Sequence, residues 1–270
     1  MFKANINKKK FKFMQVINKI LNLEISNFFW LLIMRKISRF YKIYFIPTNK
    51  KTLPLNNHPV GDLRGFFEHQ FSFYKNKKFN LYVYYFLKKN FKKNAKIRFL
   101  DYGGENLDLY LYLKDQFPRI EITIINQNKF NIELKRLIRN KKIKDIKVFK
   151  NIKNSKNLKY NFVHFGSSLQ YLRNYEKILK FLLRKTVGFL CISASSFFYE
   201  DIKKRIITKQ VNLLPIIMYC YIFNFNYLKK LVISQNFKIL SKKANPYKKI
   251  NFNNFDFKVD HLNLVFKKNI

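Results

Sequence analysis

The chain has 270 residues, of which 48% are apolar, so it is long enough for one large domain with a substantial core and a shorter appendage. Its formal charge of +40 would ordinarily indicate a nucleic-acid or anionic-membrane partner. However, Lys, Asn, Ile, Phe and Tyr are abundant together, as in proteins of A/T-rich genomes, and the lysines are scattered, so specific nucleic-acid binding is disfavoured.

Residues 1–60 are expected to form a basic, aromatic-rich helical extension and a linker. The apolar run at 28–34 is much shorter than the roughly 20 residues that span a bilayer, and no small-residue cleavage site marks a signal peptide. Basic residues flank this run, so it is either an interfacial helix on an anionic membrane or a helix that packs on the protein or a partner. Three prolines between residues 46 and 60 then break the chain.

Residues 61–270 are expected to form the main domain, in which apolar runs alternate with amphipathic stretches. Strands followed by helices predict an α/β fold with a doubly wound parallel sheet. Segment 195–226 interrupts the alternation, and two strands close the domain. The expected strands are 97–101, 120–125, 147–149, 162–165, 187–192, 237–240 and 262–266, and the expected helices are 80–91, 107–117, 132–140, 175–184 and 226–235.

Two polar loops are expected at the carboxyl ends of the first two strands. The first strand ends in Asp101, and Gly103 and Gly104 follow, which allow a sharp turn and close approach of the backbone to a ligand. After the second strand come Asn126 and Gln127, where nucleotide-binding folds place an acid for the ribose hydroxyls. An amide both accepts and donates a hydrogen bond, more weakly than a carboxylate accepts one. The alternative for each loop is an ordinary polar turn.

A third polar loop follows the fourth strand. Gly166 permits close approach, and Ser167 and Ser168 either bind a polar ligand group or cap the next helix. His164, inside the strand, is either a core histidine or a general base. Cys191 and Cys220 lie in apolar runs, and no Cys/His spacing indicates a metal.

Several segments together resemble a bacterial family of class I S-adenosylmethionine-dependent methyltransferases that is often associated with surface-polysaccharide biosynthesis. The similar segments lie between about residues 60 and 242, and the most specific is Ser-Ser-Leu-Gln-Tyr at 167–171. The resemblance implies a Rossmann-like, mostly parallel sheet of seven strands, with the cofactor over the first, second and fourth strands. The segments, in order, are 99–104, 163–172, 208–211, 219–224 and 235–237.

The resemblance also implies roles for the loop residues. Two positions depart from the family pattern: Glu105 follows Gly104 where the family has a further glycine, and Asn126 replaces the usual acid. By this resemblance, Asp101, Gly103 and Gly104 line the cofactor, Asn126 and Gln127 face its ribose, Ser167 and Ser168 lie near the methyl group or the substrate, and Gln210 and Asn224 lie on the substrate side.

The expected function is methyl transfer to a small-molecule or sugar acceptor, in the cytoplasm or peripherally at the inner face of the membrane. His164 is the candidate base. Two alternatives stay open. One is a catalytically inactive methyltransferase fold that binds a partner or acts as a scaffold, which the two departures favour. The other is an RNA-binding protein, which the charge and the aromatic residues favour and the scattered lysines disfavour.

Overall fold

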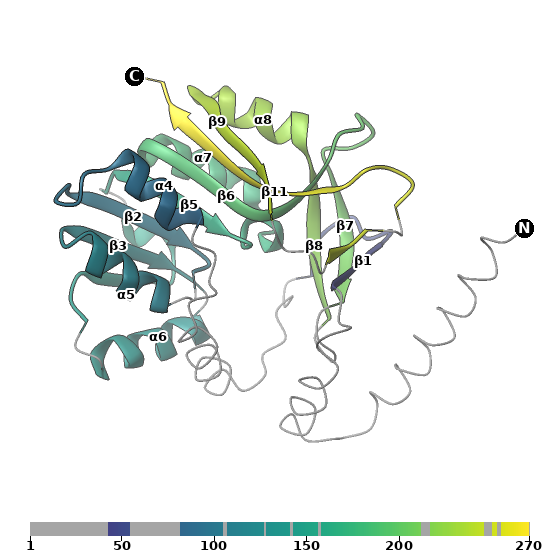
Figure 1. Cartoon of the computed structure of the whole chain (residues 1–270). Coiled ribbons are helices and arrows are strands. Elements are labelled where there is room, and N and C mark those ends of the chain that lie inside the picture. The colour runs from purple at the N-terminus through teal and green to yellow at the C-terminus, as the bar shows by residue number, and fades with distance from the viewer. Residues whose placement is uncertain are drawn as a thin grey trace, which may run out of the picture.

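The computed structural model describes residues 43–54, 82–104, 107–126, 128–140, 143–155, 158–211, 217–245, 250–252 and 255–269. Helices lie on both sides of a mostly parallel sheet (Figure 1). The expected interfacial helix, Glu105 and Gln127 lie outside the described residues. No helix within these ranges is long and apolar enough to cross a membrane.

Seven strands form the sheet that the sequence predicted, which confirms the α/β doubly wound fold. Five parallel strands lie in the order β4, β3, β2, β5, β6, and β11 and β9 complete this part of the sheet by antiparallel pairing of β6 with β11 and of β11 with β9. The central strands read as apolar runs because helices cover both faces. Their bounds are β2 (Ile97–Tyr102), β3 (Ile120–Ile125), β4 (Ile146–Phe149), β5 (Tyr160–Gly166), β6 (Thr186–Phe198), β9 (Phe237–Ala244) and β11 (Asp260–Lys268).

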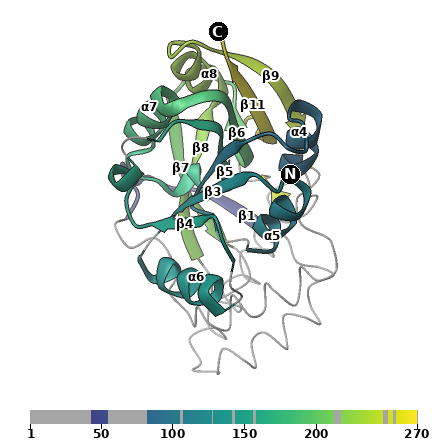
Figure 2. The same ribbon diagram turned by 90° about the vertical axis from the view of Figure 1, so that its left-hand side faces the viewer.

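Five helices cover the two faces, and each matches an expected one (Figure 2). Neighbouring residues of β2 point to opposite faces: Phe99 packs in one apolar cluster with Leu113, and Leu100 packs in another with Leu179. The first cluster holds α4 (Tyr82–Asn90), α5 (Leu107–Gln116) and α6 (Asn128–Asn140); the second holds α7 (Tyr175–Lys185) and α8 (Phe225–Ile233). Two short 3-10 helices, η1 (Ile152–Ser155) and η2 (Leu169–Tyr171), lie in loops.

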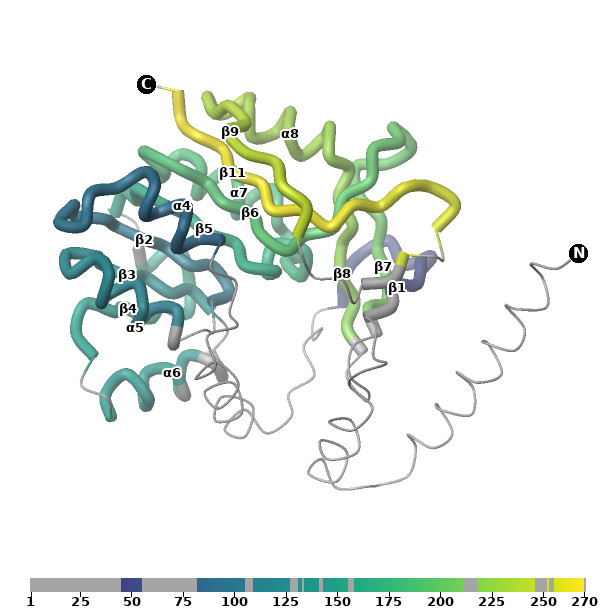
Figure 3. The backbone as a smooth tube through the Cα atoms, in the orientation of Figure 1, coloured from purple at the N-terminus to yellow at the C-terminus, as the bar shows by residue number. Residues whose placement is uncertain are grey.

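Four further strands, which we call the auxiliary sheet, were not expected, so the described residues form a sheet of eleven strands rather than seven. The interrupting segment contains the end of β6 and a hairpin of β7 (Arg205–Val211) and β8 (Ile217–Asn224). β1 (Ile43–Pro47) pairs with β7 although it is far away in sequence (Figure 3). The division of the chain at residue 60 stays a prediction; β1 is a strand that pairs with the main part of the chain from the N-terminal side of that division. The fourth strand is β10 (Ile250–Asn251), which pairs with β1.

Candidate functional site

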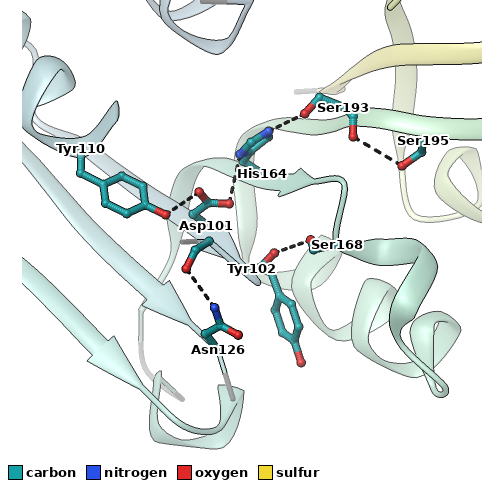
Figure 4. A network of polar contacts seen from close by, with 9 residues as sticks. Asp101, Tyr102, Tyr110, Asn126, His164, Ser168, Ser193 and Ser195 are labelled. Atoms are coloured by element: carbon teal, nitrogen blue, oxygen red, sulfur yellow. Dashed lines mark hydrogen bonds and ion pairs between the residues drawn. The ribbon is translucent and has the colours of Figure 1, made fainter. Parts of the chain in front are cut away.

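The carboxyl ends of β2, β3 and β5 form the candidate site. The chain proceeds from β2 to β3 and β4 on one side and continues with β5 and β6 on the other, so the strand order reverses between β2 and β5. Ligands of open α/β sheets bind at such a switch point. The loops meet there, because the Ser168 hydroxyl donates a hydrogen bond to the carbonyl oxygen of Tyr102 (Figure 4).

The turn after β2 requires glycine at position 103. Gly103 has a φ of +75°, in the left-handed region that favours glycine. A Cβ there would lie 2.5 Å from the Cβ of Ser168. The N–H of Gly103 donates to the carbonyl oxygen of Ile125, 2.7 Å away, so the turn is also bound to the end of β3.

Asp101 and Gly104 pack against each other inside the protein. Asp101 is 3% exposed, and the Tyr110 hydroxyl donates to its Oδ2 over 2.7 Å. A Cβ on Gly104 would lie 2.0 Å from the hydroxyl oxygen of Tyr110 and 2.6 Å from Oδ2 of Asp101. Gly104 is thus required by this internal contact.

His164 is bound on both ring nitrogens. Its Nδ1 lies 3.0 Å from Oδ1 of Asp101, and its Nε2 lies 2.7 Å from Oγ of Ser193. The residue is 5% exposed, and its ring leaves the neighbouring Gly166 no room for a Cβ, which would lie 2.7 Å from Cε1 of the ring. These contacts favour the core histidine over the general base. Ser193 was not among the residues expected at the site; its signal in the sequence is a polar residue directly after the apolar run 187–192.

Asn126 ties the ends of two strands together. Its Nδ2 donates to the carbonyl oxygen of Gly104 over 3.0 Å, and its own carbonyl oxygen accepts from Nδ2 of Asn131 over 2.8 Å. The residue expected to face the ribose therefore also holds the turn after β2.

The two serines of the third loop differ in their contacts. Ser167 has a φ of +54°, and its Oγ accepts from Nε2 of Gln170 over 3.2 Å. Ser168 stands at the N-cap position of η2 but makes no side-chain capping hydrogen bond. Its hydroxyl is instead bound to Tyr102, so helix capping is not what Ser168 does.

The two residues expected on the substrate side lie in the auxiliary sheet. Oε1 of Gln210 accepts from the Tyr171 hydroxyl over 2.7 Å, which links β7 to the loop after β5. Burial raises the pKa of Tyr171, so this hydroxyl keeps its proton. Asn224 is 2% exposed; its Oδ1 caps α8 by accepting from the N–H of Tyr227, and its Nδ2 donates to the carbonyl oxygen of Glu200. These contacts explain Asn224 as a helix cap.

Comparisons with known proteins identify the fold. No family model matches the chain, and no curated protein matches its sequence. Among solved structures, a candidate sarcosine dimethylglycine methyltransferase from Galdieria sulphuraria has a TM-score of 0.52 at 10% identity, covering 69% of this chain and 84% of that one. The chain therefore has a methyltransferase-like fold.

Two other similar structures have TM-scores of 0.49. A 1,6-didemethyltoxoflavin-N1-methyltransferase from Burkholderia thailandensis is 13% identical, over 84% of this chain and 95% of that one. An S-adenosylmethionine-dependent methyltransferase from Clostridium acetobutylicum is 11% identical, over 77% and 100%.

Proposed function

We propose that this protein is an S-adenosylmethionine-dependent methyltransferase that acts on a small-molecule or sugar acceptor. The observation that carries the proposal is the glycine turn at Gly103, with its φ of +75°, at the switch point between β2 and β5. A left-handed glycine there lets the backbone approach a bound nucleoside closely. The Ser-Ser-Leu-Gln-Tyr segment at 167–171 and the methyltransferase-like fold support the same function.

The residues at the three loops fit the cofactor through backbone and neutral polar groups. The backbone at Gly103 and Gly104 would face the methionine and ribose, the Asn126 amide would take the ribose hydroxyls, and Ser167 and Ser168 would lie toward the transferred methyl group. S-adenosylmethionine, when bound, supplies an electrophilic methyl group on a sulfonium. The protein then has to hold the acceptor in line with it and exclude water, which accounts for most of the rate of such a displacement.

Neither Asp101 nor His164 serves as the acceptor's base in this proposal. Both are almost fully buried, and their polar atoms bind Tyr110, Ser193 and each other. The acceptor lies instead toward Gln210 and Tyr171, which join the auxiliary sheet to the loop after β5. A glycan precursor of surface polysaccharide is the acceptor class we propose, and the basic, aromatic N-terminal sequence would hold the enzyme at the inner face of the membrane.

Calorimetric titration with S-adenosylmethionine and S-adenosylhomocysteine tests this proposal. We expect micromolar binding of both, and loss of binding in Gly103→Leu, which places a side chain against Ser168. Leu240→Ala, at an exposed position on β9, is the matched control and should bind normally. Circular dichroism checks that each variant is folded; if Gly103→Leu is not, Asn126→Ala, which removes one amide, should bind more weakly. No heat up to millimolar cofactor with folded wild-type protein would contradict the proposal.

The second candidate is a catalytically inactive methyltransferase fold that binds a partner. One observation favours it: Asp101, Asn126 and Ser168, all expected to contact the cofactor, each bind another part of the protein. A ligand would have to compete with these contacts. The same titration separates the two candidates, because only the inactive fold gives no heat.

A further inference from the structure

A buried chain of hydrogen bonds runs beneath the candidate site, from Tyr110 through Asp101 and His164 to Ser193; we call it the Asp101 network (Figure 4). It joins α5, β2, β5 and β6. Asp101, His164 and Ser193 are 3%, 5% and 2% exposed, and Tyr110 is fully buried. Polar groups this deep are stable only when they are paired, and a paired network fixes the geometry of its members.

The chemistry of the groups sets the direction of the two hydrogen bonds that Asp101 makes in the network. A carboxylate only accepts, so Tyr110 donates to Oδ2 of Asp101 and the Nδ1–H of His164 donates to Oδ1. Oγ of Ser193 lies 2.7 Å from Nε2 of His164, and which of the two donates depends on whether the imidazole carries one proton or two. Asp101 thus accepts from two side chains, and the ring of His164 is held in one orientation between Asp101 and Ser193.

Two glycines of the site loops rest directly on this network. Gly104 lies against the Tyr110 hydroxyl and the Asp101 carboxyl, and Gly166 lies against the ring of His164. Asp101 and His164 are also register partners in the pairing of β2 with β5. A shift of either side chain therefore moves the backbone of both loops at the switch point.

We propose that the Asp101 network positions the two loops and so sets the affinity of the site for its nucleoside ligand. Tyr110 and Ser193 are positioning residues: each acts through Asp101 or His164 and lies beneath the loops. This inference rests on the proposed function for the identity of the ligand, and on the contacts of Gly104 and Gly166 for the positioning itself.

Ser193, His164 and Asp101 contact one another in the same order as the triad of a serine hydrolase. A nucleophilic serine must meet its substrate, but Ser193 is 2% exposed and its carbonyl oxygen accepts the N–H of Ser167 over 2.9 Å. The backbone of the neighbouring loop thus lies against this residue. Burial and these contacts assign the three residues to positioning.

Matched pairs of variants test the inference. Tyr110→Phe removes one hydroxyl that donates to a carboxylate over 2.7 Å, and Tyr199→Phe removes a hydroxyl that donates to Asp260 over the same distance, outside the network. Ser193→Ala removes a serine–histidine contact of the network, and Ser196→Ala removes one outside it, between Ser196 and His261.

Three measurements are made at a temperature where each variant is fully folded. Hydrogen exchange of the backbone amides at 103–104 and 166–168 reports the loops. Calorimetry with S-adenosylhomocysteine reports the affinity, and the Nδ1 proton of His164 in a ¹H–¹⁵N NMR spectrum, assigned by its loss in His164→Gln, reports the tautomer. For Tyr110→Phe and Ser193→Ala we expect about tenfold faster exchange, about tenfold weaker binding (~1.4 kcal/mol) and a shifted Nδ1 proton. The two control variants should change each quantity less than about twofold.

Each outcome decides a different point. Unchanged loop exchange and affinity in Tyr110→Phe and Ser193→Ala would overturn the positioning role and leave only a contribution to stability. Faster loop exchange in a wild-type background that binds no cofactor would support positioning of the loops and contradict the proposed function. Labelling of Ser193 by a fluorophosphonate in the native protein would overturn the assignment and indicate a nucleophile.

Discussion

The carboxyl edge of β2 and β5 and the auxiliary sheet satisfy their polar and charged groups in different ways. At the edge, side chains bind each other through directed hydrogen bonds, as Asp101 and His164 do. In the auxiliary sheet, Arg205 lies over the ring of Tyr221 at 4.6 Å and that of Tyr175 at 5.3 Å. Hydrogen bonds depend steeply on angle, whereas a cation over a ring tolerates a range of positions. At the edge, the hydrogen bonds therefore hold Asp101 and His164 in one relative orientation, whereas Arg205 keeps its contact with the two rings over a range of positions.

The two regions also differ in how they are attached. β5 pairs with both β2 and β6, and helices cover it on each face. The auxiliary sheet joins β6 through the pairs of Phe197 with Phe223 and Phe198 with Asn224. Its own buried apolar cluster is small, with Phe45, Phe198, Cys220 and Ile222 at its centre. We expect it to open at a lower free energy than the parallel strands.

The largest expected loss of stability comes from adding a methyl group at position 104, next to the carboxyl end of β2. Gly104→Ala places a Cβ 2.0 Å from the Tyr110 hydroxyl oxygen and against the Asp101 carboxyl, and it should lower the free energy of unfolding by about 3 kcal/mol. Urea denaturation measures it. In Gly104→Ala/Tyr110→Phe the clashing hydroxyl is gone, so the double variant should be at least about 1 kcal/mol more stable than the sum of the single effects. If the two changes in the free energy of unfolding simply add, a side chain at position 104 does not clash with the Tyr110 hydroxyl.

A second prediction concerns pH and His261, near the junction of the two regions. Burial lowers the pKa of His261 to about 4, below its ordinary value of 6.5. The unfolded chain therefore takes up a proton at higher pH than the folded chain, and stability falls as the pH drops from about 6.5 toward 4. Between pH 7 and 5 this should remove roughly 2 kcal/mol. His261→Gln should show a correspondingly smaller loss in urea titrations across that range, and an equal loss would contradict the assignment.

The two described cysteines test whether the auxiliary sheet opens before the parallel strands, because Cys220 lies in the auxiliary sheet and Cys191 in a parallel strand. Burial raises the pKa of both Cys191 and Cys220, that of Cys220 to about 12, so both should be inert to thiol reagents until the structure opens. In moderate urea Cys220, in β8, should be labelled about tenfold faster than Cys191, in β6 (~1.4 kcal/mol). Mass spectrometry of the two peptides measures the ratio. Equal rates would mean that the two regions open as one unit.

The smallest expected effect is that of the cation in the auxiliary region. Arg205→Leu removes the guanidinium from two rings and should lower the free energy of unfolding by about 1 kcal/mol. Glu176→Gln removes the ion pair with Arg205, whose two side chains are 31% and 32% exposed, and should cost less than about 0.5 kcal/mol. Equal losses in urea denaturation would assign the stabilisation to the ion pair.

Sequence patterns predicted the parallel strands because each is a continuous apolar run bounded by turn residues, as in 120–125. β7 was missed because Arg205–Val211 shows no regular alternation of polar and apolar residues, and β1 because its partner is distant. β8 is a continuous apolar run, so the same criterion that predicted the parallel strands could have found it. At the site, the sequence indicated Asp101, Gly103 and Ser168 as polar or small loop residues. It did not reveal that Gly104 and Gly166 are required by Tyr110 and His164, since that depends on which side chains meet across strands.

β1 also sets a condition on how the protein is made. Thr48, next to β1, binds Ile207 in β7, 159 residues later. At about 5 to 20 residues per second, a ribosome needs roughly 8 to 30 s to synthesise the partner strand after β1. During that time the segment Ile-Tyr-Phe-Ile-Pro of β1 is already on the nascent chain, but its pairing partner β7 has not yet been synthesised. The auxiliary sheet therefore closes late, and during synthesis the apolar segment is available to chaperones.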